Sequence, residues 1–337
     1  MSTSRLVPSP ARRLIPGTAI TAILIAGVAL ATGNSASAAT ASRPAVSAAS
    51  APAASAPAVT ASANTPHSGP SRRAYDPMTG STVTVYKPTG TTPVHPEKLT
   101  HPADDTMGAV TTAYGRSSGN AAGPAITAEV AGLPGIDVSS YQGDLNWASI
   151  APYVDFVYAK ATEGTYYTNP DFTNQYEGPY DQGVIRGAYH FGIPNNSTGA
   201  TQADYFAARG GGWSADGLTL PGALDIEYNP YGAECYGLTK AEMTSWIWDF
   251  VNEYAYDTGV YPVIYSTNDW WTTCTSNDSG FASYDPFWIA DYSSSAGTLP
   301  AGYSYYTFWQ YADSGSEPGD QDVFNGSYSR LQALALG

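Results

Sequence analysis

The chain has 337 residues and a formal net charge of −15, with 14 Lys and Arg against 29 Asp and Glu. The acidic residues concentrate late in the chain, because the region from residue 131 onward holds 24 of the 29 acidic residues and only 5 of the 14 basic ones. A region this acidic repels phosphate backbones, which argues against nucleic acid as a partner.

Residues 1–38 have the pattern of a secretory signal peptide. Arg5, Arg12 and Arg13 give a basic start, residues 19–31 form an apolar core, and Ala36-Ser37-Ala38 is a small-residue cleavage site. The apolar core is shorter than the roughly 20 residues of a membrane-spanning helix. We therefore predict a secreted protein, extracellular or associated with the cell wall, with no membrane attachment after cleavage. The Arg12-Arg13 pair leaves open whether export is general or twin-arginine.

Residues 39–130 read as a low-complexity spacer. Up to about residue 72 the segment is almost entirely Ala, Ser, Thr and Pro, too little apolar bulk to offset the entropy of ordering, so we predict disorder. The alternating run from Thr82 to Tyr86 predicts one short strand. The remainder carries no motif, and a pro-segment, a wall-spanning spacer and a plain linker all remain open.

The composition changes at about Leu133. All eight Trp and both Cys lie beyond this point, so residues 131–337 predict one domain with a substantial core. Apolar runs predict strands at 136–138, 156–160, 184–191, 218–227, 260–266, 287–290 and 306–309. Helical spacing predicts helices at 169–182, at 197–209 and from a capping box at Thr239 to a stop at Gly259.

The alternation of strands and helices predicts an α/β fold, with parallel strands joined by helical crossovers. Seven or eight strands in this length suit a closed, TIM-like barrel with reduced helices in its second half. Chemistry in such barrels sits at the carboxyl ends of the strands. Polar residues fall at these ends: Asp137, Glu163, His190, Asp225, Glu227, Asp291 and Gln310.

The stretch Leu224-Asp225-Ile226-Glu227 carries the strongest chemical signal. Strand alternation places Asp225 and Glu227 on one face. Two carboxylates this close disfavour double ionisation, so the pKa of one should rise and supply a proton donor beside an ionised partner. A solvated loop or a cation site is the alternative interpretation.

The cysteine and histidine content bears on disulfide and metal chemistry. Cys235 and Cys274 are an even pair in a predicted exported protein, which favours a disulfide, and the absence of a C-x-x-C motif argues against a redox pair. His190 is the one histidine after residue 131, so we predict no metal and no cofactor.

Eight stretches, in order along the domain, resemble one family. They are G-I-D-V-S-S-Y-Q-G at 135–143, Y-A-K-A-T-E-G at 158–164, R-G-A-Y-H-F at 186–191, Q-A-D-Y-F at 202–206, L-D-I-E at 224–227, V-I-Y-S at 263–266, F-W-Q-Y at 308–311 and D-Q-D-V-F-N-G at 320–326. The region from Gly135 to the C-terminus thereby resembles the Chalaropsis-type lysozymes, glycoside hydrolase family 25, and within them the secreted actinomycete-type members.

The resemblance implies a modified barrel of about eight strands that hydrolyses the β-1,4 bond between N-acetylmuramic acid and N-acetylglucosamine in bacterial peptidoglycan. It implies that Glu227 is the general acid and that Asp225 supports the N-acetyl group of the substrate, which itself attacks; a direct nucleophilic role for Asp225 is the alternative. Asp137 matches the carboxylate of the first strand and Asp320 that of the last. Asp322 stands where the family pattern has Asn, and a small shift in alignment would make Asp322 the functional residue instead of Asp320.

Aromatic residues near the strand ends are candidates for sugar binding, because pyranose rings pack on aromatic faces. These are Tyr189, Tyr265, Trp288 and Trp309, with core packing as the alternative for each. Glu163 is either a further subsite residue or the structural ion-pair partner of Lys160. We expect a monomer that acts on cell-wall peptidoglycan.

Other classes of protein fit the sequence less well. A chitinase of the D-x-x-D-x-D-x-E type would need acidic residues where this chain has Leu220 and Ala223. A non-catalytic wall-binding module would be expected to lack one of Asp137, Asp225 and Glu227, and all three are present. An exported structural protein would not explain the matches at separate strand ends.

Overall fold

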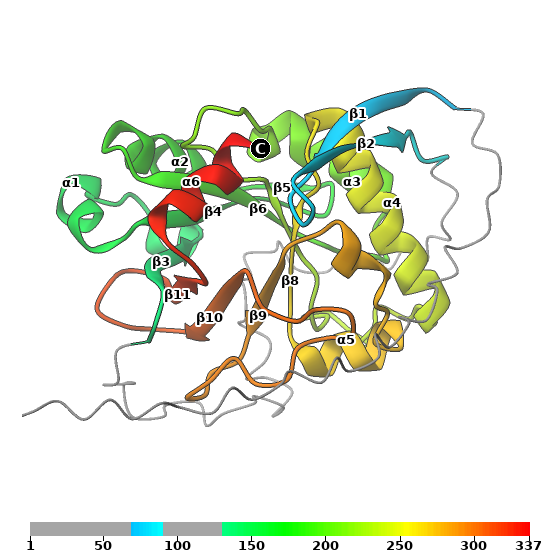
Figure 1. Cartoon of the computed structure of the whole chain (residues 1–337). Helices are drawn as coiled ribbons and strands as arrows, with labels where there is room; N and C mark the ends of the chain where they lie inside the picture. Colours follow the sequence, from blue (N-terminus) through cyan, green and yellow to red (C-terminus); the bar gives the residue numbers. More distant parts are fainter. Residues whose placement is uncertain (1–68, 90–129) are drawn as a thin grey trace, which may run out of the picture. The chain divides into compact units, whose positions relative to one another are not determined.

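The computed structural model of the protein describes residues 69–89 and 130–337 (Figure 1). Its main feature is a closed barrel, formed by β3 (Leu133–Val138), β4 (Phe156–Glu163), β6 (Ile185–Phe191), β7 (Ala223–Asp225), β8 (Val263–Ser266), β9 (Phe287–Ala290), β10 (Phe308–Ala312) and β11 (Asp320–Phe324). The barrel closes because β3 pairs with both β4 and β11. The short β5 (Tyr167–Thr168) pairs with the end of β4. The predicted barrel is confirmed.

One strand runs against the others. The barrel strands from β3 to β10 are parallel, whereas β11 is antiparallel to both of its neighbours, β10 and β3. The expectation of parallel strands with helical crossovers fails here, because the short 313–319 connection cannot hold the crossover that a parallel neighbour needs.

Helices cover the first half of the barrel more fully than the second (Figure 1). The α-helices are α1 (Trp147–Ile150), α2 (Phe172–Asp181), α3 (Gly199–Phe206), α4 (Lys240–Thr258), α5 (Asn268–Thr275) and α6 (Tyr328–Leu336). Shorter helical turns are η1 (Ser140–Gln142), η2 (Ala151–Tyr153), η3 (Ala207–Gly211) and η4 (Gly280–Ser283). The described chain has no helix between β9 and β10 or between β10 and β11, so the predicted loss of helices late in the barrel is confirmed. No helix in the described ranges is long and apolar enough to cross a bilayer.

Local signals set several boundaries. The capping box of Thr239 and Glu242 starts α4, and Gly259 ends it with a φ of 85°, both as predicted. Two predicted strands begin later than expected. Pro221 and Pro262 precede β7 and β8, and a proline cannot donate a ladder hydrogen bond.

Large side chains fill the interior of the barrel and the layer outside it. Phe156, Tyr158, Trp288 and Phe308 pack together inside, with ring centroids 4.8–5.7 Å apart for the pairs Phe156–Phe308, Tyr158–Trp288, Tyr158–Phe308 and Trp288–Phe308. Leu331 and Ala335 of α6 join this interior cluster. A second cluster lies between the barrel and α3, α4 and α5. The barrel is therefore a packed core and not a pore.

A β-hairpin precedes the barrel within the predicted spacer. It consists of β1 (Ser71–Asp76) and β2 (Ser81–Tyr86), and it lies beside α4 (Figure 1). The strand predicted at 82–86 is confirmed; its partner strand and its attachment to the barrel were not predicted. The Tyr75 N–H donates to the Gly259 carbonyl at 2.7 Å, and the Tyr261 N–H donates to the Tyr75 carbonyl at 3.1 Å. The predicted signal peptide and most of the predicted spacer lie outside the described residues.

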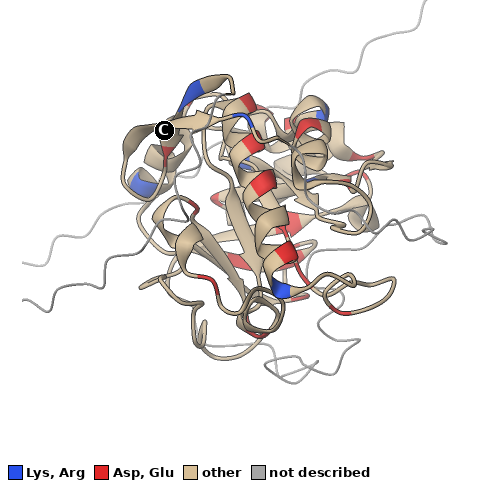
Figure 2. Ribbon diagram, turned by 90° about the vertical axis from the view of Figure 1, so that its right-hand side faces the viewer, with Lys and Arg blue, Asp and Glu red and all other residues tan. Residues whose placement is uncertain are grey.

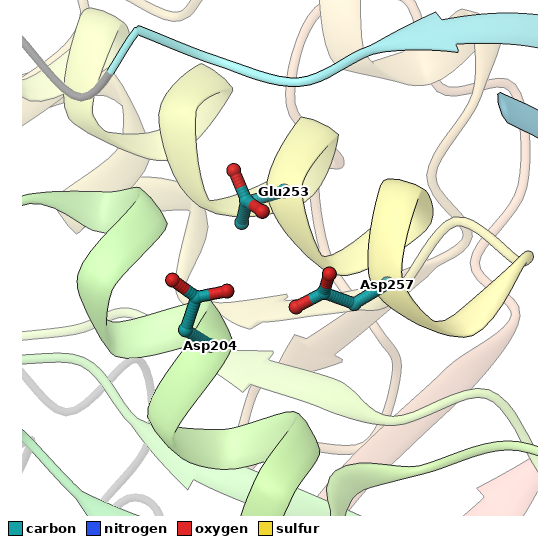
Figure 3. Close-up of side chains that lie close together, drawn as sticks. All are labelled: Asp204, Glu253 and Asp257. Atoms are coloured by element: carbon teal, nitrogen blue, oxygen red, sulfur yellow. The ribbon is translucent and has the colours of Figure 1, made fainter. Parts of the chain in front are cut away.

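Lys87 attaches the hairpin to an acidic helix surface. Asp and Glu residues are spread along α4 (Figure 2). Glu253 and Asp257 of α4 lie beside Asp204 of α3, with one carboxylate oxygen from each within 4.8 Å of the others (Figure 3). The Lys87 ammonium lies 2.5 Å from Glu253 Oε1 and 3.9 Å from Asp204 Oδ1. Only 1% of the Glu253 side chain is exposed, so Lys87 compensates a buried charge.

We predict that Lys87→Met lowers the free energy of unfolding by about 1–2 kcal/mol, since it leaves the buried Glu253 carboxylate without its cation, while the exposure of Lys87 limits the cost. Urea unfolding near neutral pH measures the change. The double variant Lys87→Met/Glu253→Gln also removes the buried Glu253 charge and leaves only the partly exposed Asp204 and Asp257 without the cation, so part of the loss should be recovered. A double variant less stable than Lys87→Met would contradict this account of the attachment.

Candidate active site

The carboxyl end of β7 presents the predicted acidic pair. Asp225 is the last residue of β7, and Glu227 follows it by two positions. Ile226 between them belongs to the outer cluster, and its N–H donates to the Tyr265 carbonyl of β8 at 3.1 Å. Both carboxyl side chains are buried, and the charge of Glu227 acts on the pKa of Asp225. The structure therefore brings the two together, as alternation along the strand predicts.

A second acidic group forms where β3 meets β11. Asp137 and Asp320 lie directly opposite each other across the antiparallel pair. Gln310 of β10 joins them, because its Nε2 donates to Asp137 Oδ2 at 2.7 Å and to Asp320 Oδ2 at 3.0 Å. Gly319 approaches the β3 backbone so closely that a Cβ there would lie 2.1 Å from the Asp137 carbonyl oxygen. The start of β11 is thereby held tightly against β3.

Two tyrosines fix the orientation of the Gln310 amide. Its Oε1 accepts hydrogen bonds from the hydroxyls of Tyr265 at 2.7 Å and Tyr292 at 2.8 Å. With both donors bound to the oxygen, the nitrogen must face the carboxyls. Sequence reasoning placed Gln310 at a strand end but not among the site residues, and it missed Tyr292. The position of Tyr292 directly after the polar end of β9 was the available signal.

Asp322 lies two residues after Asp320 on β11, opposite Gly135 of β3 and Gln310 of β10. Its Oδ1 accepts a hydrogen bond from Trp288 Nε1 at 3.0 Å. Because β11 runs antiparallel to β3, Asp320 at the start of β11 lies at the same end of the barrel as Asp137, near the carboxyl end of β3. Asp320 is connected to Asp137 through Gln310, and the Asp322 carboxyl is itself hydrogen-bonded to Asp137. Both thus adjoin the site, and the assignment of the family's last-strand role to Asp320 stays a prediction.

Burial raises the pKa values of these carboxyls. The pKa of Asp225 lies well above its ordinary value because of burial and then the charge of Glu227, while Lys160 opposes the rise. Burial likewise raises the pKa of Asp137 to about 7, opposed by the hydrogen bond from Gln310. The pKa values of Asp320 and Asp322 are also raised, first by burial and then by Asp137. Asp137, with its pKa raised to about 7, can thus hold a proton near neutral pH, and burial shifts the pKa of Asp225 in the same direction.

Glu163 forms the structural ion pair that sequence reasoning considered. Its Oε2 lies 2.7 Å from the Lys160 ammonium, and both side chains are buried. The hydroxyls of Tyr166 and Tyr231 donate to Glu163 Oε1 at 2.8 and 2.7 Å. Tyr231 belongs to the loop after Glu227, so this ion pair also positions that loop. A subsite role for Glu163 stays a prediction.

The four predicted sugar-binding aromatics do not share one face. Tyr189, Tyr265 and Trp288 are buried in the interior cluster. Trp309 points to the outer cluster, and its Nε1 donates to the Asp291 carbonyl at 2.8 Å. The structure thus brings three of the four together, and their contact with a sugar stays a prediction.

His190 alternates with Tyr189 and faces the outer layer. Its ring lies beside Phe206 and Phe250 and bonds to Thr162 Oγ1 and Gln202 Oε1. Burial lowers the pKa of His190 to about 3, so the ring is neutral and structural.

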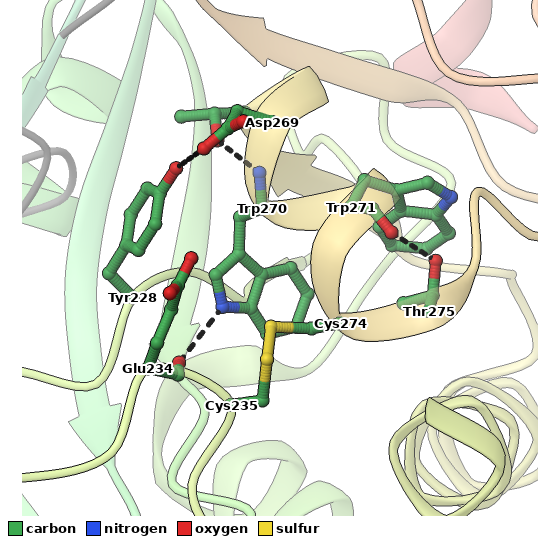
Figure 4. Close-up of a disulfide and its surroundings, with 9 residues drawn as sticks. Tyr228, Glu234, Cys235, Asp269, Trp270, Trp271, Cys274 and Thr275 are labelled. Atoms are coloured by element: carbon green, nitrogen blue, oxygen red, sulfur yellow. Dashed lines mark hydrogen bonds between the residues drawn. A yellow bond between two sulfur atoms is a disulfide. The ribbon is translucent and has the colours of Figure 1, made fainter. Parts of the chain in front are cut away.

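The disulfide fixes the loop that follows Glu227. Cys235 in this loop is bonded to Cys274 of α5, as predicted (Figure 4). Trp270 Nε1 donates to the Glu234 carbonyl at 3.2 Å, and the Tyr228 hydroxyl donates to the Asp269 carboxylate. Residues on both sides of the loop are therefore tied to α5, which restrains the backbone next to Glu227.

We predict that Gln310→Leu reduces the activity of the folded protein at least about tenfold, because Asp137 and Asp320 lose their shared donor and two tyrosine hydroxyls lose their acceptor. The matched control is Gln202→Leu, which removes an equally buried amide from His190 on the outer face. Both variants should lose stability in urea unfolding, but only Gln310→Leu should lose activity beyond its folded fraction. Equal activity loss in the two would contradict a positioning role.

We also predict that acidification from about pH 8 to about pH 5 stabilises the fold. Between the ordinary carboxyl value of 3.8 and the raised value of about 7 for Asp137, the folded protein holds a proton that the unfolded chain has lost. At Asp137, protons therefore favour folding through this window, and that gain disappears as the pH rises through about 7. His190 opposes part of the gain below about pH 6.5, because its buried ring stays neutral in the folded protein while the unfolded chain takes up the proton. Urea midpoints across the range measure it, and Asp137→Asn should flatten the profile. A midpoint that falls on acidification would be inconsistent with these buried carboxyls.

Comparison with known proteins identifies the family of the barrel. The family described as "Glycosyl hydrolases family 25" matches residues 136–320. "Lysozyme M1" of Streptomyces globisporus is 50% identical over 214 residues, covering 62% of this chain and 73% of that protein. "N,O-diacetylmuramidase" of Chalaropsis sp is 46% identical over 210 residues, covering 61% of this chain and 100% of that protein.

Solved structures show the same similarity. The muramidase structure from Acremonium alcalophilum has a TM-score of 0.60 at 56% identity and covers 61% of this chain and 99% of that one. The lysozyme structure from Streptomyces coelicolor has a TM-score of 0.60 at 50% identity and covers 62% and 99%. The predicted family is confirmed: the chain belongs to glycosyl hydrolase family 25 and is a glycoside hydrolase.

Proposed function

We propose that the barrel is a lysozyme that hydrolyses the β-1,4 bond between N-acetylmuramic acid and N-acetylglucosamine in bacterial peptidoglycan. Relatives named lysozyme and N,O-diacetylmuramidase, at 46–50% identity, support this substrate class. The observation that carries the proposal is the buried pair of Asp225 and Glu227 at the end of β7, within electrostatic reach of Asp137.

Glu227 is the proposed general acid. A glycosidic oxygen leaves only once it is protonated, so the reaction needs a carboxylic acid beside the bond that breaks. Glu227 extends beyond the last residue of β7, on a loop fixed by the disulfide and by Tyr231, so its carboxyl is held at the strand ends where a substrate can meet it.

Asp225 is the proposed partner of the substrate's N-acetyl group. Neither of its carboxylate oxygens has a hydrogen-bond partner within the described residues, although the side chain is buried. A buried carboxyl without a partner is costly, and an acetamido N–H of the substrate would supply the missing donor. Oriented in this way, the acetamido oxygen can attack the anomeric carbon, which is the substrate-assisted route.

Asp137 and Asp320 are proposed to complete the site from the opposite side of the barrel. Gln310 holds both carboxyls in place, and Asp137 acts on the pKa of Asp225. Their role is to bind sugar hydroxyls and to tune the acidic pair. Tyr189, Tyr265 and Trp288 would form the floor beneath the sugar, and no metal or other cofactor takes part.

We further propose that the protein is secreted, with a signal peptide at 1–38, a spacer at 39–130 that includes the hairpin, and the catalytic barrel at 131–337. A disulfide fits an exported protein. In this proposal the protein acts as a monomer on the cell wall, without nucleic-acid or membrane partners.

The direct test is release of reducing muramic ends from purified peptidoglycan. Wild type should release them, and Glu227→Gln should be slower by at least about 100-fold, since general acid catalysis contributes about that much or more. Asp225→Asn should also be strongly impaired, whereas Glu177→Gln on the exposed face of α2 is the matched control. Near-full activity of Glu227→Gln would falsify the acid role. Wall binding without release by wild type would support a non-catalytic wall-binding module instead.

A further inference from the structure

A pocket lies at the end of the barrel opposite the catalytic carboxyls. It has a volume of about 190 Å³. Its lining residues include Tyr75 and Met78 of the hairpin, Tyr305 and Tyr306 before β10, and Asn325 and Arg330 around the start of α6. The chain enters β10 at this end, whereas Asp225 stands at the far end of the parallel strands. Ligands at the two sites would therefore not compete for space.

The lining residues combine aromatic rings with hydrogen-bonding groups. Tyr305 is 44% exposed, and burial raises the pKa values of Tyr75 and Tyr306, so the hydroxyls of these two residues stay protonated. Asn325 Nδ2 donates to the Tyr306 carbonyl at 2.9 Å and thereby fixes this wall. Tyrosine rings beside an amide are the surfaces on which pyranose rings and their N-acetyl groups pack.

Arg330 supplies the positive charge of the pocket. Its guanidinium makes no hydrogen bond or ion pair with any described residue, and it lines the pocket. The other basic residues after residue 131 are engaged or distant: Lys160 pairs with Glu163, Arg186 and Arg209 lie over tyrosine rings, and Lys240 starts α4. An unpaired guanidinium in so acidic a domain selects a carboxylate, which it can bind through two parallel hydrogen bonds.

The pocket lies only partly within the family match. That match spans residues 136–320 and includes Tyr305 and Tyr306, whereas the hairpin precedes it and Arg330 follows it. None of the carboxyls of the catalytic end lines this pocket.

We propose that this pocket is a second glycan site, which binds an N-acetylated pyranose that carries a carboxylate on a side arm. The muramyl-peptide units of peptidoglycan have this chemistry, so the choice of ligand rests on the proposed function. Occupancy would hold the enzyme on the insoluble wall while the catalytic end acts elsewhere, and the linked sites would raise the local substrate concentration.

The test is an NMR titration of the full chain with muramyl dipeptide, followed at the backbone amides of Asn325 and Arg330. The chemical shifts of these two amides report binding in this pocket and not binding at the catalytic end. We expect saturable shifts in wild type and about tenfold weaker binding in Arg330→Gln, the loss typical of one charge-assisted hydrogen-bonded contact. N-acetylglucosamine, which lacks the carboxylate, should bind the wild-type protein about as weakly as muramyl dipeptide binds Arg330→Gln. Arg209→Gln is the charge-matched control and should bind as wild type does.

Tyr305→Ala provides a second variant, which removes the exposed ring and leaves the charge; it should also weaken binding. Absence of shifts at these amides in wild type, or equal affinity in wild type and Arg330→Gln, would overturn the proposal. The titration needs no turnover. A protein that hydrolyses no peptidoglycan but shows Arg330-dependent binding would refute the proposed function alone, and an active enzyme without such binding would refute only this site.

Discussion

Closure of the barrel by an antiparallel last strand is the constraint on which the site depends. β3 must pair with β4 on one side and with β11 on the other. Because β11 runs against its neighbours, its first residue, Asp320, reaches the strand-end level and lies opposite Asp137. A parallel strand in this place would put its last residue there instead. The connection from β10, too short for a helix, therefore determines that Asp320 lies opposite Asp137.

Burial of several carboxyls in one region opposes stability at neutral pH, and the surrounding residues limit that cost. Gln310 donates to two of the carboxyls, and its own orientation is fixed by Tyr265 and Tyr292. Lys160 pairs with Glu163 and also opposes the rise in the pKa of Asp225. Asp225 itself has no hydrogen-bond partner in the described chain. Asp137, Asp320 and Glu163 thus receive hydrogen bonds from the residues around them, whereas Asp225, which is proposed to meet the substrate, receives none from the described residues.

The sequence predicted the features that local patterns determine, and less of what long-range pairing determines. The capping box and Gly259 defined α4, and the apolar runs located the barrel strands. The direction of β11 and the Gln310 bonds to Asp137, 173 positions away in the chain, depend on closure and leave no local signal. Alternation along one strand also could not tell which of Trp288 and Trp309 faces the interior, because that depends on the register between strands. The hairpin's attachment through Lys87 was hidden by its low-complexity surroundings.

The most direct test of this account is the pKa of Asp225, measured by NMR titration of protein carrying ¹³C-labelled aspartate carboxyls, with Asp225→Asn to assign the signal. The account predicts that Asp225 titrates well above its ordinary value, and that its pKa falls in Glu227→Gln because the neighbouring charge is removed. An Asp225 that titrates at about its ordinary value, or that does not respond to Glu227→Gln, would contradict the claim that the barrel gathers these two carboxyls into one coupled site.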